Sequence, residues 1–218
     1  MSRKRKELPV LEDLTISDVA AEGNAIARAD EMVVFIPFGA PGDVADVKID
    51  KKKKSYAEGH IVKLKKPSEI RVEPRCEHFT ICGGCRWQHL PYEFQIKCKQ
   101  QQVYDALTRI ARVPFPEITP IIGSKQIWEY RNKMEFSFGD EYKDGPLALG
   151  LHKRDSFHDI VTAKECKIVN KDYNKILTCV LEHFSERNVK FYHKMRHEGY
   201  LRHLVIRRGV KTNQIIMS

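Results

Sequence analysis

The sequence predicts a mixed α+β protein, with a small OB-like β-barrel near its start and an antiparallel α/β domain after it. Three observations support this fold class. Short apolar runs with the two-residue period of strands fill residues 7–70, helical periods appear after residue 90, and three of the six cysteines fall within ten positions between these regions. A chain of 218 residues is long enough to build two small domains, each with a core.

Residues 1–70 are predicted to form the barrel. Residues 45–49 alternate between apolar and polar, and "MVVFIP" at 32–37 and "GHIVKL" at 59–64 are further short apolar runs with glycines and prolines between them. A closed barrel is favoured because closure removes the exposed edges of several short strands. The four lysines at 51–54 are expected at a solvated hairpin tip or, alternatively, on an edge that contacts phosphates.

Residues 91–218 are predicted to form the second domain, which combines helices with antiparallel strands. A helix begins near Pro91, and a second helix with a clear apolar stripe follows Asn170, its predicted N-cap. Between the helices, alternating residues at 134–138 and a second run at 147–151 flank a Gly-Pro turn. This arrangement indicates an antiparallel hairpin.

The last segment, "LRHLVIRRGVKTNQIIMS", contains a strand, a turn near residues 209–213 and a returning strand that has barely begun at Ser218. A natural end would rarely leave such a short apolar strand unpaired. We therefore expect the chain to be the N-terminal portion of a longer protein, with the domain at 91–218 truncated at its C-terminal end.

The composition favours a soluble protein with a polyanionic partner. Lys and Arg exceed Asp and Glu by 38 − 29 = 9, and such an excess favours nucleic acids because each neutralised phosphate releases condensed counterions. No apolar run reaches the length of a membrane span, and the first residues lack the apolar stretch of a signal peptide. A cytoplasmic, monomeric protein with reduced cysteines is expected.

The segment "CEHFTICGGCRWQHL" predicts a metal site. Cys76, Cys82 and Cys85 have the spacing C-x5-C-x2-C, and two glycines let the backbone bring its N–H groups close to whatever the thiolates bind. Structural zinc sites typically use two separated C-x2-C pairs, whereas an iron–sulfur cluster accepts three thiolates from one wrapped loop. The spacing favours an iron–sulfur loop at 71–90, with a zinc site and inert buried thiols as alternatives.

A fourth ligand would have to come from another segment, and three cysteines are candidates. Cys98 lies in the first predicted helix, and Cys179 lies mid-way along the second, where a cysteine behaves as a small hydrophobe. Cys166 stands in a polar connection before the second helix. A loop thiol is freer to reach another segment, so Cys166 is favoured.

Five motifs in this order carry a resemblance: "CEHFTICGGCRWQHL", "YEFQIKCKQQQV", "YRNKMEFSFG", "LGLHKRDSFHDIV" and "ECKIV". Together they resemble the N-terminal half of the RNA uracil-C5 methyltransferases, and most closely the bacterial 23S rRNA 5-methyluridine enzymes. The resemblance implies an RNA-binding TRAM barrel at 1–70 and 23S rRNA as the RNA partner. It also implies a 4Fe-4S cluster held by Cys76, Cys82, Cys85 and Cys166.

The resemblance further implies a C-terminal Rossmann-like domain that binds S-adenosylmethionine and carries the catalytic residues. No strand–glycine-rich loop–helix pattern occurs in this sequence. We therefore expect that domain to be absent, with no catalytic or cofactor-binding residue before Ser218 and an inactive fragment. In the family, a thiolate adds to uracil C6, C5 takes the methyl group and a base removes the C5 proton, and the target base must leave its stack. The present residues would supply RNA binding and a structural cluster.

Basic and aromatic residues at strand ends are the candidates for RNA contact. Neighbouring strands should bring these ends together, and such mixtures suit looped or single-stranded RNA, where stacking and guanidinium contacts replace groove recognition. A solvated strand end is the alternative for each residue alone. The candidates are Tyr130, Arg131, Lys133, Lys153, Arg154, Arg207 and Arg208.

Two other functions are open. The chain could be a self-standing RNA-binding module that uses an iron–sulfur cluster or a zinc ion as a structural fastener, without methyltransferase activity. A radical S-adenosylmethionine enzyme that modifies RNA can pair a similar barrel with an iron–sulfur centre, but its usual C-x3-C-x2-C spacing is absent here. A glycine-rich cofactor motif in the reading frame after Ser218 would separate the first possibility from the methyltransferase.

Overall fold

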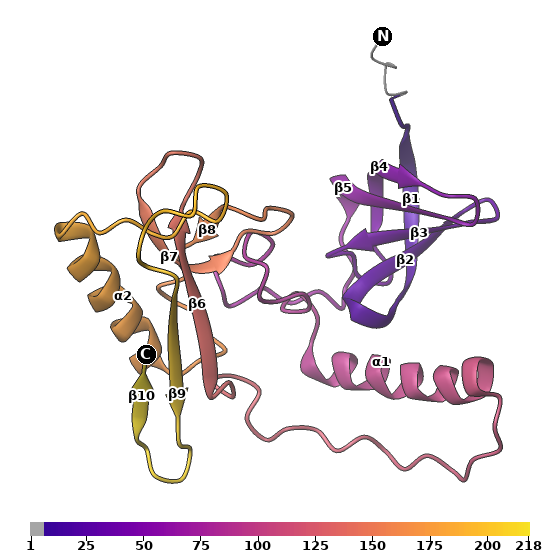
Figure 1. Ribbon diagram of the computed structural model, residues 1–218. Coiled ribbons are helices and arrows are strands. Elements are labelled where there is room, and N and C mark those ends of the chain that lie inside the picture. Colours follow the sequence, from indigo (N-terminus) through magenta and orange to yellow (C-terminus); the bar gives the residue numbers. More distant parts are fainter. Residues whose placement is uncertain (1–6) are drawn as a thin grey trace. The chain divides into compact units, whose positions relative to one another are not determined.

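The computed structural model describes residues 7–218, which fold as two compact units (Figure 1). Unit 1 contains the chain up to Glu73 together with Arg86–Gly123, and unit 2 contains Pro74–Cys85 together with Ser124–Ser218. The segment that carries the three clustered cysteines therefore belongs to unit 2. None of the helices between residues 7 and 218 has the length and apolar character that a membrane crossing requires.

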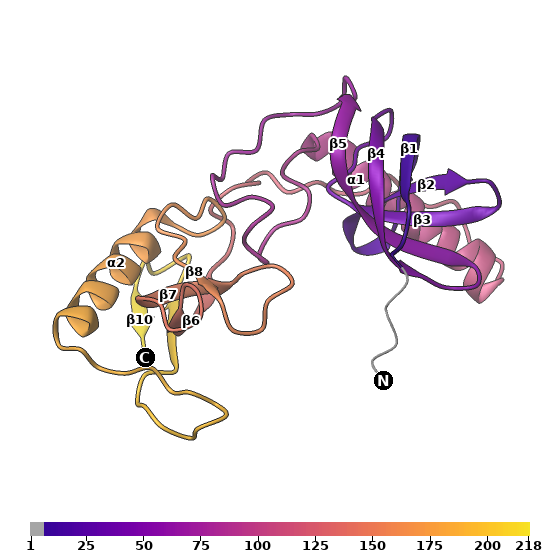
Figure 2. The ribbon, with the colours of Figure 1, turned by 90° about the horizontal axis from the view of Figure 1, so that it is seen from above.

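Unit 1 is built on a closed five-stranded barrel, which Figure 2 shows from above. The strand order is β1-β2-β3-β5-β4, and all neighbours are antiparallel except β3 and β5, which run parallel. A short 3₁₀ turn, η1 (Ala21–Gly23), joins the first two strands. The strands are β1 (Val10–Val19), β2 (Asn24–Ala29), β3 (Met32–Pro37), β4 (Val44–Lys52) and β5 (Tyr56–Lys66).

The barrel interior is filled by small and β-branched side chains at alternate positions. Ala45, Val47 and Ile49 of β4 all point inward and are buried, as the alternation predicts. A Cβ added to Gly59 would lie 2.5 Å from the Lys48 carbonyl oxygen, so β5 can approach β4 there only with glycine. The two-residue period thus determines which face of each strand forms the core.

Helix α1 (Tyr92–Asp105) continues into a π-helical turn, η2 (Ala106–Ala111), and belongs to unit 1. This differs from the expected boundaries, which assign everything after residue 90 to the second domain. The physical reason is that the helix packs beside the barrel: Phe94 and Cys98 contact a small buried cluster around Val19, and Gln102 Nε2 donates to the Ala20 carbonyl oxygen at 3.2 Å.

Unit 2 is a five-stranded antiparallel sheet with one helix, α2 (Lys171–Glu186), on one face (Figure 1). The strand order is β10-β9-β6-β7-β8, and the predicted hairpin is formed by β6 and β7. Asn170 caps α2 as predicted, because its side chain accepts from the Asp172 N–H at 3.1 Å. The strands are β6 (Lys133–Asp140), β7 (Leu147–His152), β8 (Ile160–Val161), β9 (His203–Arg208) and β10 (Ile215–Met217).

The two faces of this sheet differ in chemistry. Met134 and Ile206 are paired across β6 and β9 and are buried in the core with Tyr173 of α2. The neighbouring pair, Lys133 and Arg207, therefore projects from the opposite face, because successive side chains on a strand alternate. The sheet thus presents a polar, basic face away from its helix.

Candidate functional site

The cysteine loop, Pro74–Cys85, is fastened to the end of strand β7. Cys82 and Lys153 form an isolated antiparallel bridge, and the Gly83 N–H donates to the His152 carbonyl oxygen at 3.0 Å. The loop thus adds a short strand-like contact to the sheet. This contact fixes the backbone that carries two of the three clustered cysteines.

The two glycines of the loop permit an approach that larger residues would hinder. A Cβ on Gly83 would lie 3.1 Å from the His152 carbonyl oxygen, and a Cβ on Gly84 would lie 3.1 Å from Cδ1 of Leu151. The Gly84 N–H also donates to the Cys82 sulfur, with a nitrogen-to-sulfur distance of 3.4 Å. The backbone therefore supplies a donor to the Cys82 thiol, and it does so without the positive φ that such a pair of glycines would permit.

Cys166 lies between β8 and α2 and is held from both sides. Its side chain is only 7% exposed, and its carbonyl oxygen accepts from Asn174 Nδ2 of α2 at 3.2 Å. The backbone N–H groups of Ile168 and Val169 act on the thiol and lower its pKa, against the larger effect of burial. Amide donors of this kind stabilise a thiolate, because they place partial positive charge beside the sulfur.

The four predicted metal ligands all belong to unit 2. Burial raises the pKa of both Cys82 and Cys166, and electrostatic interaction with Cys85 and Cys76 raises each further. Cys82 and Cys166 thus each interact with the thiols of Cys85 and Cys76. Among the residues described, no three or more His, Cys, Asp or Glu side chains are arranged to hold a metal ion.

The two remaining cysteines lie elsewhere. Cys98 is on α1 in unit 1, where it packs against the small buried cluster, and burial raises the pKa of its thiol. Cys179 is exposed on α2. A raised pKa is the opposite of what activates a cysteine nucleophile, so we assign Cys98 no catalytic role.

Arg154 differs from the other predicted RNA contacts. Its guanidinium donates to the Cys85 carbonyl oxygen at 3.0 Å and to the Cys82 carbonyl oxygen at 3.4 Å. Its backbone N–H donates to the Ile81 carbonyl oxygen at 2.8 Å. The side chain is thus engaged with the cysteine loop.

Three of the predicted RNA contacts line one open pocket of 700 Å³ at the end of the sheet. Lys133 and Arg207 lie opposite each other in the β6–β9 register, and Arg208 follows on β9. The Arg208 guanidinium donates to the side-chain oxygen of Asn213, in the turn after β9. The sequence analysis did not identify the polar residues that line the same pocket: Asn132, Thr212 and Gln214. Their only signal in the sequence is that they lie near the predicted cations.

The other predicted contacts are spread around this end of the sheet. Lys153 follows β7, and the register of β6 with β7 places the end of β7 beside the start of β6. Tyr130 is 58% exposed and interacts electrostatically with Cys85 and Cys166, so it lies beside the four-cysteine site. Arg131 Nε donates to the Lys133 carbonyl oxygen at 3.1 Å.

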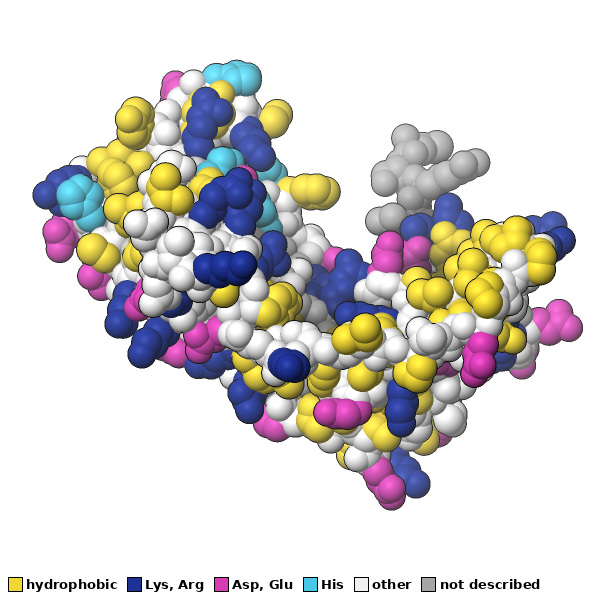
Figure 3. All heavy atoms as spheres, turned by 90° about the horizontal axis from the view of Figure 1, so that it is seen from below, with side chains coloured by type: hydrophobic (Ala, Val, Ile, Leu, Met, Phe, Trp, Pro, Cys, Tyr) yellow, Lys and Arg dark blue, Asp and Glu magenta, His cyan; other side chains and the backbone are white. Residues whose placement is uncertain are grey.

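Histidines lie among the basic side chains of unit 2. Burial lowers the pKa of His152, and interactions with Lys194, His203 and His158 lower it further. Figure 3 shows Lys, Arg and His side chains gathered on the face of unit 2 that it presents. The sequence offers no period for the segment that contributes Lys194, because that segment is neither a helix nor a strand.

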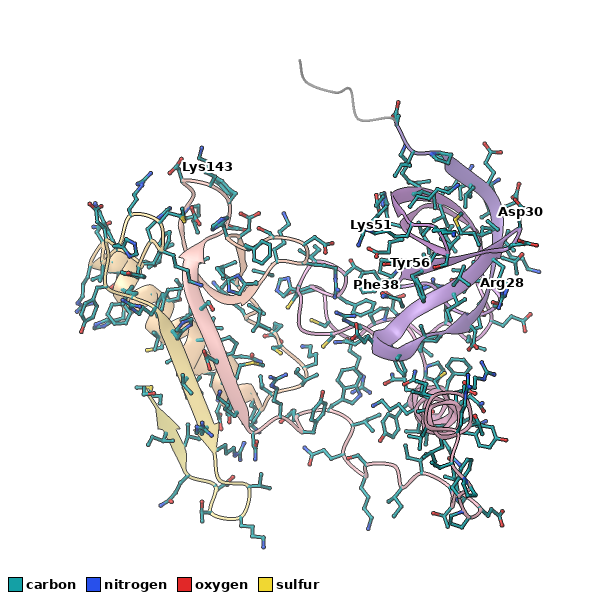
Figure 4. The ribbon with its side chains drawn as sticks, turned by 45° about the vertical axis from the view of Figure 1, so that its right-hand side comes forward. Arg28, Asp30, Phe38, Lys51, Tyr56 and Lys143 are labelled. Carbon is teal, nitrogen blue, oxygen red and sulfur yellow. The ribbon has the colours of Figure 1, made fainter. Side chains whose placement is uncertain are left out.

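The barrel carries a second group of aromatic and basic side chains. Lys51 and Tyr56 lie on the same side of the barrel (Figure 4). Tyr56 meets Phe35 edge to face, with 5.8 Å between ring centroids. Lys51 Nζ donates to Glu58 Oε1 at 2.9 Å, so part of the charge of the lysine run is balanced within the barrel.

The chain is similar to known proteins over most of its length. The family model of the TRAM domain matches residues 10–62, which include β1 to β4 and the first part of β5. A Porphyromonas gingivalis protein named "Uncharacterized RNA methyltransferase" is 41% identical over 211 residues, covering 89% of this chain and 45% of that protein. A Clostridium tetani protein of the same name is 38% identical over 216 residues, covering 99% of this chain and 46% of that protein. The chain thus spans about half the length of the curated relatives it matches.

One solved structure shares the fold. It is a Pyrococcus abyssi tRNA (uracil-54, C5)-methyltransferase in complex with S-adenosyl-L-homocysteine, with a TM-score of 0.64 and 23% identity, covering 94% of this chain and 44% of that chain. At this identity the match establishes the fold alone.

These matches correct the predicted fold class. The sequence predicted a chain that lacks the methyltransferase fold, but 94% of it superposes on a methyltransferase and 89% aligns with a relative named for that activity. The error came from requiring one local pattern, the strand–glycine-rich loop–helix. The barrel and the antiparallel sheet belong to the fold of a methyltransferase without containing that pattern, so we withdraw the prediction of a fragment without that fold.

Proposed function

Because the chain belongs to the same family as these RNA methyltransferases, we propose that the protein methylates C5 of uracil in RNA with S-adenosylmethionine. The observation that carries the proposal is the 41% identity over 89% of the chain to a protein named RNA methyltransferase. The ordered sequence motifs favour uracil C5 and a uridine of 23S rRNA. The name of the Pyrococcus abyssi enzyme makes a tRNA uridine the second candidate.

In this proposal Cys76, Cys82, Cys85 and Cys166 hold a 4Fe-4S cluster. The support is that two separate segments contribute mutually interacting thiols, two of them largely buried and each of those two bonded to backbone N–H donors. A single zinc ion would need its four ligands to converge about 2.3 Å from one point. Each thiolate of a cluster binds a different iron, so the sulfurs can stay further apart.

The cluster would join the loop at 74–85 to the segment around Cys166 and would thereby stabilise one end of the sheet. Metal binding of this kind contributes directly to folding free energy, because the ligands come together only in the folded chain. The protein residues supply the rest of the arrangement: Gly84 donates to one sulfur, and Asn174 fixes the backbone of another ligand.

RNA would lie on the basic face of unit 2 and on the TRAM barrel. Lys133, Arg207, Arg208 and Lys153 would contact phosphates from one end of the sheet, where their charges add. Tyr130, with its half-exposed ring, would stack on an unpaired base. Such contacts bind and orient the RNA.

The test follows the hydrogen that methylation must remove. Purified protein is incubated with S-adenosylmethionine and either 23S rRNA or tRNA transcripts that carry tritium at uridine C5. We expect tritium release that depends on S-adenosylmethionine, with 5-methyluridine identified by mass spectrometry of the digested RNA. Methyl transfer without tritium release would contradict uracil C5 as the acceptor, and no transfer to either RNA would contradict the proposed function.

A further inference from the structure

Arg154 is the side chain that connects the sheet to the cysteine loop. One guanidinium reaches the carbonyl oxygens of Cys85 and Cys82, at 3.0 and 3.4 Å. Its own backbone is part of the same junction, because its N–H donates to the Ile81 carbonyl oxygen and the preceding residue, Lys153, bridges to Cys82. An arginine suits this geometry, since its planar fork of donors can serve two acceptors at once.

Arg154 also carries a charge. Its guanidinium lies within hydrogen-bond distance of the carbonyl oxygens of two ligand residues, and so brings a positive charge to the cysteine loop. Other cations near the site have partners of their own: Lys167 pairs with Glu165 at 2.8 Å, and Arg75 lies over the Trp128 ring, 5.0 Å from its centroid. Arg154 combines a positive charge with hydrogen bonds to two ligand residues.

We propose that Arg154 is a positioning residue of the four-cysteine site: it fixes the carbonyl groups of Cys82 and Cys85 and places a positive charge beside these two ligand residues. This inference rests on the proposed function, because it requires the four cysteines to hold a cluster. It removes Arg154 from the RNA-binding surface and leaves Lys153, the adjacent residue, there. Arg154 and Lys153 are therefore assigned different roles, although they are adjacent in the chain.

The inference can be tested with three variants of the whole chain. Arg154→Gln removes the charge and shortens the reach, Arg154→Lys keeps the charge but not the fork, and Lys153→Gln is the matched control. The cluster is followed anaerobically by its visible absorption while a chelator removes iron. Residues that support metal ligands in this way typically contribute about 10- to 100-fold to metal retention.

We expect Arg154→Gln to lose iron about 10- to 100-fold faster than the wild type, Arg154→Lys to be intermediate, and Lys153→Gln to match the wild type. Partial rescue by lysine distinguishes a charge at the site from mere packing. The thermal unfolding of the iron-free proteins is measured alongside, because the lost hydrogen bonds to the Cys82 and Cys85 carbonyl oxygens also lower stability without iron. Iron loss is then compared at a temperature at which all the iron-free variants are folded.

An unchanged rate of iron loss in Arg154→Gln, or equal losses in Arg154→Gln and Lys153→Gln, would overturn the inference while leaving the cluster in place. A wild-type protein that binds no iron at all would instead overturn the proposed cluster, and the inference with it. The two failures are therefore distinguishable in a single set of preparations.

Discussion

Replacing Asp43 with asparagine should destabilise unit 1 by about 3 kcal/mol. This carboxylate is fully buried at the start of β4 and accepts four hydrogen bonds. Its Oδ1 accepts from the Ser68 N–H and from Arg71 Nε, both at 2.8 Å. Its Oδ2 accepts from the Ala40 N–H at 2.7 Å and from Arg71 Nη2 at 2.6 Å. Asp43 thus links the segment after β5, which carries Ser68 and Arg71, to the barrel.

The magnitude follows from what asparagine can replace. Its one oxygen can serve the donors on one side, but its NH₂ group would face two donors on the other, so two hydrogen bonds are lost in either orientation. Removing one partner of a buried ion pair costs about 3–5 kcal/mol. The Arg71 side chain is 21% exposed, so water can hydrate part of the charge left behind. The lower end of the range therefore applies, which is still a large fraction of a domain's stability of about 5–15 kcal/mol.

The same carboxylate makes stability depend on pH. Burial alone would raise the pKa of Asp43, but the hydrogen bonds from Arg71, Ala40 and Ser68 outweigh burial and hold the pKa below its ordinary value of 3.8. The stabilising contribution is therefore complete above pH 3.8, the pKa expected in the unfolded chain, and is lost as the pH falls through the lower, folded value. Asp43→Asn should lack this part of the acid sensitivity.

The assay is urea denaturation followed by the fluorescence of Trp87, in a Trp128→Phe background, so that only unit 1 is reported. Asp50→Asn is the control, because Asp50 forms an exposed pair with His60 at 2.8 Å, and such pairs contribute at most about 1 kcal/mol. A loss in Asp43→Asn no larger than that of the control would refute the reasoning. The reasoning would also be refuted if acidification lowered the stability of Asp43→Asn as much as that of the wild type.

Two further sets of substitutions test the cysteine site and the basic face of unit 2. Cys166→Ser should lose most of its iron. The unfolding free energy of the iron-free protein should change by only about 1 kcal/mol, because the hydroxyl can accept the same backbone N–H bonds. Cys98→Ser should keep its iron, and equal losses of iron in the two variants would contradict the ligand assignment. The double variant Lys133→Gln/Arg207→Gln should bind RNA more weakly and reduce the slope of log K against log salt by about 2, or about 1 per phosphate contact. Lys175→Gln, on exposed α2, should leave that slope unchanged, and an unchanged slope in the double variant would remove these residues from the RNA surface.

Patterns that repeat along the chain were predictable. The alternation at Ala45, Val47 and Ile49 identified the inward face of β4, and Asn170 identified the first turn of α2. In both cases the signal is local, because a strand or helix with one buried face must place apolar residues at a fixed period. The same reasoning predicted the β6–β7 hairpin from its turn.

Other features depend on which segments meet, and a period does not carry that information. No residue of α1 is buried: Val103 is 52% exposed, and Ile110 in the following turn η2 is 82% exposed, although the apolar period of the sequence would place both on one face. Lys153 and Arg154 are equivalent in sequence as adjacent basic residues, and only the bridge from Cys82 to Lys153 determines that Arg154 turns toward the cysteine loop. Cys166 stands among polar residues but is buried, because α2 and the backbone that follows it cover the thiol.

The central claim is that four thiols from two distant segments hold one inorganic cluster, and metal analysis of the unmodified protein tests it most directly. Protein purified without oxygen should be brown and contain about four iron and about four acid-labile sulfide per chain. A colourless protein with one zinc per chain, or with no bound metal, would contradict the account.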